Sequence, residues 1–189
     1  ELKKYSDGII ALSACLAGDI SQALMDRNYE KAKNIALQYR DIFGEGNFYL
    51  EIQDHGLPEQ KEVNAALVKL SKEINIPLVA TNDIHYVNKE DSKIHDVLMC
   101  IQMGKTVNDP NRMRFGSDEF YLKSREEMEE LFPYAPEAID NTVKIAEMCN
   151  IEFDFNTIHL PKYDVPEGYT PDTYLRELCF KGLEERYDN

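Results

Sequence analysis

The sequence predicts an α/β fold, in which a parallel sheet carries helices and is followed by a helical region. Three short apolar segments, each bounded by Gly, Asn or Pro, have strand character, and they cover residues 8–13, 47–52 and 76–81. Segments with helical periodicity lie between them. This alternation is typical of a parallel sheet covered by helices. Right-handed crossovers should bring the three strand ends to one side.

The two intervening helices are predicted from apolar residues that recur at helical spacing. The first face consists of Ala32, Ala36, Tyr39 and Phe43, and the second of Val63, Ala66, Leu67, Leu70 and Ile74. Both faces should pack against the sheet.

The sequence changes in character after the third strand, where helices and loops replace the alternation. Residues 91–103 predict a helix with its apolar side facing inward, namely Ile94, Val97, Leu98 and Ile101. Residues 104–120 are loop-like. A capping box at 124–127 should begin a helix that ends near Phe132, and Pro136 should begin another that runs to about Cys149. Pro171 should begin a last helix, after a linker over 156–170, and we expect the chain to stop before that helix ends.

Composition excludes several classes of protein. A net charge of −14, with no basic run longer than Lys3-Lys4, predicts that the chain alone does not hold a nucleic-acid backbone. The four cysteines are widely spaced, which argues against a zinc finger and a disulfide scaffold and favours a reducing cytoplasm. We also expect no membrane segment, since no apolar stretch approaches the ~18 residues needed.

Residues that can bind metals follow each predicted strand, where α/β proteins gather their functional groups. Asp83 and His85 stand two apart after the third strand, so a carboxylate and an imidazole should face the same way. The alternative is a turn that starts a helix, with His85 only packing. Cys15 follows the first strand and is either a thiolate ligand or a small buried apolar residue.

The second strand ends in Glu51-Ile52-Gln53-Asp54-His55, and two interpretations stay open here. Glu51 and His55 can line the same strand-end site as the Asp83–His85 pair. Alternatively, Asp54-His55-Gly56 is a turn before the helix that Pro58 begins, and Glu51 sits in a buried hydrogen-bond network. His95, in a predicted helix, is expected to be a surface or packing residue.

Several long strings resemble bacterial DNA polymerase III alpha subunits. They are Gly8-Ile9-Ile10-Ala11-Leu12-Ser13-Ala14-Cys15, Phe48-Tyr49-Leu50-Glu51-Ile52-Gln53-Asp54-His55-Gly56, Val79-Ala80-Thr81-Asn82-Asp83-Ile84-His85-Tyr86 and Phe120-Tyr121-Leu122-Lys123-Ser124, with further matches up to Tyr187. This resemblance implies a PHP (polymerase and histidinol phosphatase) domain, a distorted β/α barrel that holds metal ions at its strand ends. Members hydrolyse phosphoesters, and in some polymerases the domain is a 3′–5′ exonuclease.

Carried over by motif, the resemblance implies that Asp83 and His85 match the family's last Asp-x-His ligand pair, and Cys15 a strand-end ligand position. Zinc or manganese is the implied metal there, with magnesium at the polymerase site of the parent. The family's His-x-His motif and the polymerase's catalytic aspartates are not in this sequence. We therefore expect a partial barrel at 1–155, and a linker with the first helix of the polymerase core at 156–189.

The expected parent is a cytoplasmic nucleotidyltransferase of DNA replication, which handles DNA and deoxynucleotides with other replisome subunits and no membrane. The chain starts at Glu1, so we expect a fragment that is inactive by itself. Two alternatives remain: a stand-alone PHP phosphoesterase acting on a small phosphate ester, and a metal-free scaffold that supports the polymerase.

Overall fold

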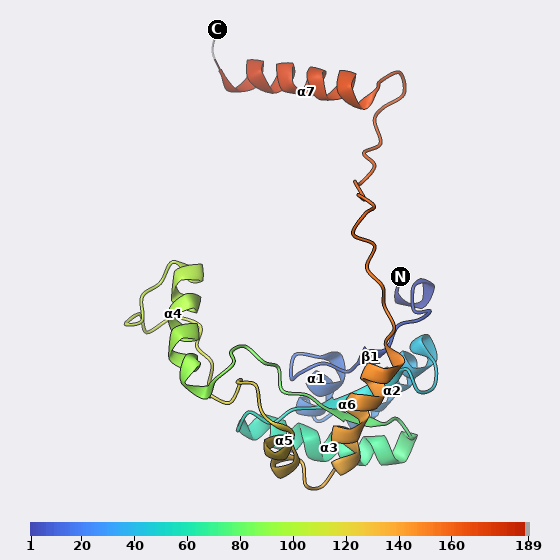
Figure 1. Cartoon of the computed structure of the whole chain (residues 1–189), viewed down its shortest axis with the longest axis vertical. Coiled ribbons are helices and arrows are strands. Elements are labelled where there is room, and N and C mark those ends of the chain that lie inside the picture. The colour runs from blue at the N-terminus through green and yellow to red at the C-terminus, as the bar shows by residue number, and fades with distance from the viewer. Residues whose placement is uncertain (188–189) are drawn as a thin grey trace. The chain divides into compact units, whose positions relative to one another are not determined.

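The computed structural model describes residues 1–187 and divides into two compact units, Glu1–Asn150 and the chain from Ile151 onward (Figure 1). The first unit contains, in order, η1 (Leu2–Lys4), β1 (Ala11–Leu12), α1 (Asp19–Met25), α2 (Tyr29–Phe43), β2 (Phe48–Ile52), α3 (Pro58–Ile74), β3 (Leu78–Ala80), η2 (Lys89–Asp91), α4 (Ser92–Met103), α5 (Arg125–Leu131) and α6 (Pro136–Met148). The second unit contains α7 (Pro171–Arg186).

The three predicted strands form one parallel sheet in the order β1-β2-β3. Ala11 pairs with Phe48 and Leu50 pairs with Leu78, so β2 lies in the middle. The strands are shorter than the apolar segments that predicted them. Their parallel order confirms that the three strand ends lie at the same edge.

Helices α2 and α3 bury the faces that their periodicity predicts. Ala32 and Ala36 of α2 are fully buried, and Leu67 and Leu70 of α3 are at most 1% exposed. These side chains join one core with five residues of β2 and β3, namely Phe48, Leu50, Ile52, Leu78 and Ala80. Apolar burial of this kind is the main stabilising contribution to the fold.

Helix α6 covers the outer edge of β3. Pro77 O accepts a hydrogen bond from Leu50 N on β2, so the next carbonyl, Leu78 O, points away from β2. Asn141 of α6, a buried residue, donates its Nδ2 to Leu78 O at 2.7 Å. An exposed strand edge invites unwanted pairing, and this helix blocks it within the first unit.

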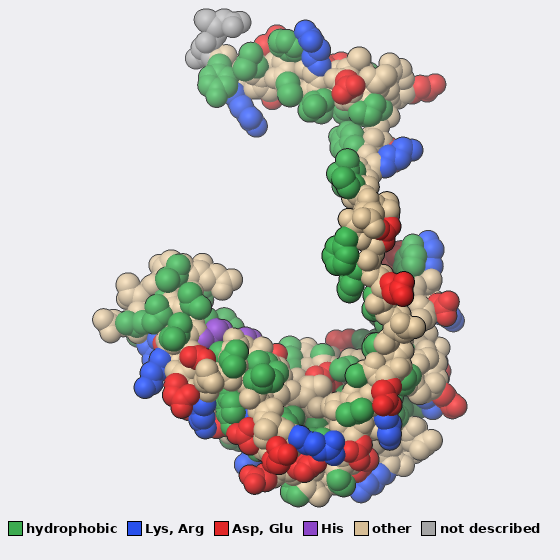
Figure 2. Space-filling view, viewed as in Figure 1, with side chains coloured by type: hydrophobic (Ala, Val, Ile, Leu, Met, Phe, Trp, Pro, Cys, Tyr) green, Lys and Arg blue, Asp and Glu red, His purple; other side chains and the backbone are tan. Residues whose placement is uncertain are grey.

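The predicted orientation of the helix over 91–103 is wrong. Helix α4 forms there, but Ile94, Val97, Leu98 and Ile101 are 45% to 70% exposed. Met99 and Cys100 are the buried residues of α4 instead. Periodicity identifies the apolar side of a helix, but it does not reveal whether any other part of the chain covers that side. Figure 2 shows hydrophobic side chains gathered on the surface of the lobe that α4 forms in Figure 1.

The second unit consists of a linker and α7. Thr170 begins α7 with a capping box to Thr173, and Pro171 occupies its first turn, as the sequence predicts. The helix ends at Arg186, which corrects the expectation that its end lies outside the chain. None of its described residues is buried. In the part of the chain that the structure describes, no helix has the length and apolar character needed to cross a membrane.

Candidate functional site

Glu51, near the end of β2, connects the ends of all three strands. Its Oε2 accepts a hydrogen bond from Ala14 N, just after β1, at 3.1 Å. Its Oε1 accepts from Gln53 Nε2 at 3.0 Å and from Thr81 Oγ1, just after β3. Ser13 Oγ in turn accepts from Glu51 N at 2.8 Å. One carboxylate therefore fixes the spacing of the strand ends, as the network interpretation predicts.

Cys15 lies on a tight turn between β1 and α1. The turn needs Gly18, because a Cβ there would lie 2.4 Å from Ser13 O. Ala14 has a positive φ of 65°, a conformation that costs a non-glycine residue about 1–2 kcal/mol. The half-buried free thiol of Cys15 lines a small cavity with Glu51 and Gln53. Gln53 Oε1 is buried and no described residue bonds it, so this cavity carries an unsatisfied acceptor.

Asp83 and His85 follow β3 in a strained turn, where Asp83 has a φ of 45°. His85 Nδ1 lies 2.7 Å from the backbone oxygen of Asp83 and 4.0 Å from its Oδ1. A carbonyl oxygen only accepts, so Nδ1 carries the hydrogen and the lone pair is on Nε2. Metal-binding histidines are commonly oriented in this way, with one ring nitrogen donating to a backbone carbonyl. The side chains of His85 and Asp83 are 31% and 44% exposed.

Aromatic rings surround His85. Its ring centroid lies 4.7 Å from that of Phe115, 5.4 Å from that of His95 and 5.5 Å from that of Phe120. His95 comes from α4 and Phe115 from the loop that follows α4. From the sequence, His95 is expected to be a surface or packing residue, and no local pattern connects it to His85.

His55 is fully buried and both of its ring nitrogens are engaged. Nε2 donates to Asn82 O at 2.7 Å, and Nδ1 accepts from Gln60 Nε2 at 2.8 Å. The same Gln60 accepts from His55 N through Oε1, which fixes its amide orientation. Burial lowers the pKa of His55, so the ring is held neutral, stacked on Phe120. This arrangement leaves no lone pair for a metal and matches the turn interpretation.

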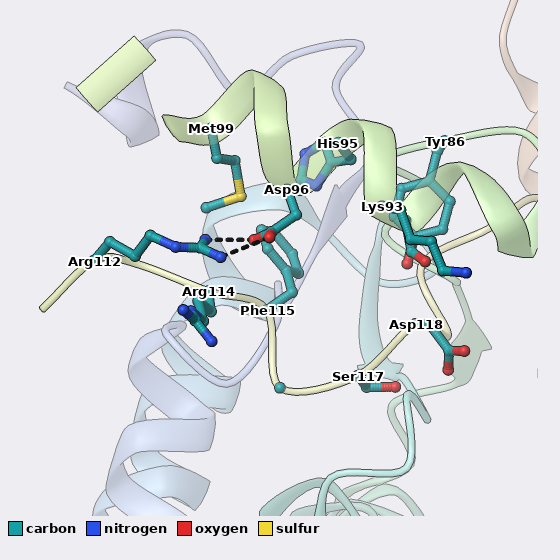
Figure 3. A pocket seen from close by; sticks show the side chains of 12 residues that line it. Tyr86, Lys93, His95, Asp96, Met99, Arg112, Arg114, Phe115, Ser117 and Asp118 are labelled. Carbon is teal, nitrogen blue, oxygen red and sulfur yellow. Dashed lines mark hydrogen bonds and ion pairs between the residues drawn. The ribbon is translucent and has the colours of Figure 1, made fainter. Parts of the chain in front are cut away.

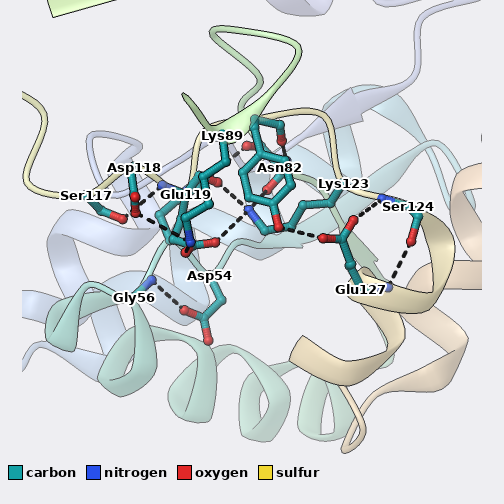
Figure 4. A network of polar contacts seen from close by, with 12 residues as sticks. Asp54, Gly56, Asn82, Lys89, Ser117, Asp118, Glu119, Lys123, Ser124 and Glu127 are labelled. Carbon is teal, nitrogen blue, oxygen red and sulfur yellow. Dashed lines mark hydrogen bonds and ion pairs between the residues drawn. The ribbon is translucent and has the colours of Figure 1, made fainter. Parts of the chain in front are cut away.

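A polar network holds the segment after β3 against residues 119–127 (Figure 4). Lys123, whose side chain is 2% exposed, donates to Asn82 Oδ1 at 3.3 Å and pairs with Glu119. Tyr121 donates to Glu127 at 2.6 Å, and this bond raises the pKa of Tyr121 to about 12. Glu127 also closes the capping box of α5 with Ser124. The backbone that presents Asp83 and His85 is thereby fixed.

Four of the five predicted site residues form two groups in the described chain, and the fifth, His55, is fully buried. Cys15 and Glu51 share the small cavity, whereas Asp83 and His85 adjoin the aromatic rings. Within residues 1–187, no three His, Cys, Asp or Glu side chains are arranged to hold a metal ion. The donor chemistry of the Asp83–His85 pair fits zinc or manganese as part of a ligand set. These residues do not complete such a set.

Comparison with known proteins is decisive for the family. A PHP domain model matches residues 1–55, which includes Cys15, Glu51 and His55. The DNA polymerase III subunit alpha of Treponema pallidum is 44% identical over 187 residues, which is 98% of this chain and 16% of that protein. Over its whole length, the chain is homologous to a segment of DNA polymerase III subunit alpha. The subunit of Borreliella burgdorferi is 46% identical, and the match covers 100% of this chain and 17% of that protein. The subunit of Thermus aquaticus is 44% identical, and the match covers 98% of this chain and 16% of that protein.

The chain spans about a sixth of the length of these DNA polymerase III alpha subunits. The partial PHP-type barrel expected from the sequence agrees with three parallel strands and their covering helices, together with the PHP match. Asp83 and His85 lie outside the residues that the PHP model matches.

Proposed function

We propose that this chain is a segment of a replicative DNA polymerase III alpha subunit. In this proposal, residues 1–155 form the C-terminal part of its PHP domain, and residues 156–189 a linker with the first helix of the polymerase core. Identity of 44% to 46% over essentially the whole chain carries the proposal. The parent acts on DNA and deoxynucleotides in the cytoplasm with other replisome subunits, and uses magnesium at its polymerase site.

The strand-end residues are proposed to contribute to a divalent metal site in that parent. Asp83 and His85 supply a carboxylate and an imidazole, and Cys15 supplies a thiolate. The free Nε2 of His85, with Nδ1 bonded to a carbonyl, supports this assignment. A bound zinc or manganese ion would supply Lewis-acid chemistry for phosphodiester hydrolysis, which makes a 3′–5′ exonuclease role the expected activity.

A metal-free scaffold is the second candidate, and the hydrogen-bond networks of Glu51 and Lys123 favour it, because they join the strand ends and the segment after β3 without any metal ion. The hydrogen-bond networks of Glu51 and Lys123 would then serve only to stabilise the fold of the polymerase subunit. Neither candidate requires this chain to hold DNA alone, since its net charge of −14 opposes phosphate binding.

Activity of the intact polypeptide that contains this sequence tests the proposal. We expect it to extend a primed template, and to release nucleotides from single-stranded DNA when zinc or manganese is present. Asp83→Asn should abolish release and leave extension unchanged. Asp164→Asn, in the exposed linker, is the matched control and should change neither. Release that survives Asp83→Asn would exclude the metal assignment, and absence of extension would exclude the polymerase assignment.

A further inference from the structure

The loop 112–118 crosses α4 with little support from its own backbone. A cavity of about 350 Å³ lies between this loop and the helix, so packing of the loop against α4 is incomplete (Figure 3). Among residues 1–187, no N–H or C=O group of residues 110–118 bonds to another backbone group. A segment with few backbone hydrogen bonds and incomplete packing opens easily. The position of this loop therefore depends on its side chains.

One ion pair ties the loop to α4. The Arg112 guanidinium donates to both carboxylate oxygens of Asp96, at 2.5 and 2.6 Å, and Figure 3 shows the two bonds. The Arg112 side chain is 3% exposed, so water competes little for it. Two-pronged bonds between arginine and a carboxylate are strong and fix the relative position of the two groups. At the other end of the loop, Asp118 pairs with Lys89 at 3.6 Å.

The two segments that this ion pair joins carry rings that pack on His85. His95 directly precedes Asp96 on α4, and Phe115 follows Arg112 by three residues in the loop. Both rings meet the His85 ring edge to face, at interplanar angles of 70° and 62°. Their own centroids lie 5.1 Å apart. These contacts restrict rotation of the His85 ring.

Rotation of the His85 ring changes where its Nε2 lone pair points. The hydrogen bond from Nδ1 to the Asp83 carbonyl, at 2.7 Å, fixes one atom of the ring, so neighbouring rings must fix its plane. Phe120 is one such ring, and its backbone oxygen accepts from His85 N at 2.9 Å. Within residues 1–187, the backbones of the other two ring residues make no hydrogen bond to this segment. Their positions depend on how α4 and the loop are held.

We propose that the ion pair between Asp96 and Arg112 positions the His85 ring for metal binding. The pair keeps α4 and the loop together, and Phe115 and His95 are thereby held against the ring. Asp96 and Arg112 act through other side chains, so they are positioning residues. The proposal deepens the proposed metal site and rests on it for the purpose of the positioning, whereas the order of the ring is measurable without metal.

The affinity of the intact polypeptide for zinc and for manganese, measured by competition with a chelator, is the first test. Arg112→Gln and Asp96→Asn should each weaken binding about tenfold to hundredfold, which is the usual effect of removing a group that orients a metal ligand. Arg125→Gln is the matched control, because it breaks an ion pair with Asp140 at another place on the surface. It should bind metal like the wild type.

Labelling of His85 by diethyl pyrocarbonate, measured by peptide mass spectrometry on the metal-free polypeptide, is the second test. We expect Arg112→Gln to raise the labelling rate of His85 several-fold, because the rings that cover it are released. The rate of His159, in the exposed linker, should stay unchanged. Phe115→Leu keeps the ion pair but removes one ring, so it should weaken metal binding and speed labelling in the same way. It decides the question if Arg112→Gln does not fold.

Unchanged metal affinity or unchanged His85 labelling in these variants would overturn the proposal, even if their melting temperatures fall, because the ion pair would then only stabilise the fold. A wild type that binds neither zinc nor manganese would exclude the proposed metal site itself. In that case labelling alone decides whether the ion pair orders the ring, so the two failures are distinguishable.

Discussion

Glu51 shows how one side chain can organise a strand-end face. It accepts hydrogen bonds from groups that follow all three strands: Ala14 N, Thr81 Oγ1 and Gln53 Nε2. All three donors are satisfied only if both carboxylate oxygens accept. The residue is therefore structural in this chain, even though it lines the cavity of Cys15.

Glu51→Gln should lower the free energy of unfolding by about 1–3 kcal/mol, because the amide NH₂ must face a donor at one of these positions. Urea denaturation followed by circular dichroism measures the change. Glu45→Gln, at an exposed turn position, is the matched control and should stay within about 0.5 kcal/mol. If Glu51→Gln is as harmless as its control, Glu51 does not hold the strand ends.

The buried neutral ring of His55 predicts a pH dependence of stability. Burial lowers the pKa of His55 in the folded state, so the unfolded chain takes up the proton first as the pH falls. Stability is therefore complete above the ordinary histidine pKa of about 6.5 and is lost as the pH falls below it. The melting temperature should drop between about pH 7 and pH 5.

His55→Phe should keep the stacking on Phe120 but remove the titrating group, so its melting temperature should be lower at neutral pH and should fall less on acidification. His159→Phe, in the exposed linker, should keep the wild-type dependence of the melting temperature on pH. Equal slopes for His55→Phe and the wild type would show that another group is responsible.

At the scale of elements, α4 offers the clearest contrast between sequence pattern and burial. Ile101 is 70% exposed, whereas Leu70 on α3 is completely covered. Ile101→Ala should therefore change the free energy of unfolding by less than about 0.5 kcal/mol, and Leu70→Ala should cost about 2–5 kcal/mol. Chemical denaturation of both variants measures this. A cost above about 2 kcal/mol for Ile101→Ala would mean that α4 is packed in solution.

The positions of most helices and strands could be predicted from the sequence, but which of their side chains other parts of the chain cover could not. The strands and α2, α3, α5, α6 and α7 were predictable, because apolar blocks, capping boxes and Pro at a first turn are local signals. The exposure of the apolar side of α4 was not, since it depends on whether a distant segment covers it. The environment of His55 was not predictable either, because it is formed by Asn82 and Phe120, which lie far along the chain.

The same limit applies to the candidate site. The D-x-H spacing predicted a carboxylate and an imidazole that face the same way from an extended segment, whereas Asp83 lies in a turn with a φ of 45°. Nothing local indicated the bond from His85 Nδ1 to the Asp83 carbonyl. The pocket of about 350 Å³ between α4 and the loop 112–118 was also invisible in the sequence, because its lining residues come from separate segments that are brought together only by folding.

At the scale of the molecule, this chain unites a partial sheet, a polar network at its strand ends and a separate linker-helix unit. Its relatives are about six times longer, so the missing metal ligands and the polymerase centre are proposed to come from the rest of such a polypeptide. We propose that Asp83 and His85 contribute to a divalent metal site there.

The metal content of the intact polypeptide, measured by mass spectrometry after gel filtration, tests this proposed site. We expect bound zinc or manganese in the wild type, and loss of that metal in the double variant Asp83→Asn/His85→Asn. The control, Asp164→Asn/His159→Asn in the exposed linker, should retain the metal. A wild type without zinc or manganese, or a site variant that retains as much metal as the control, would contradict the account.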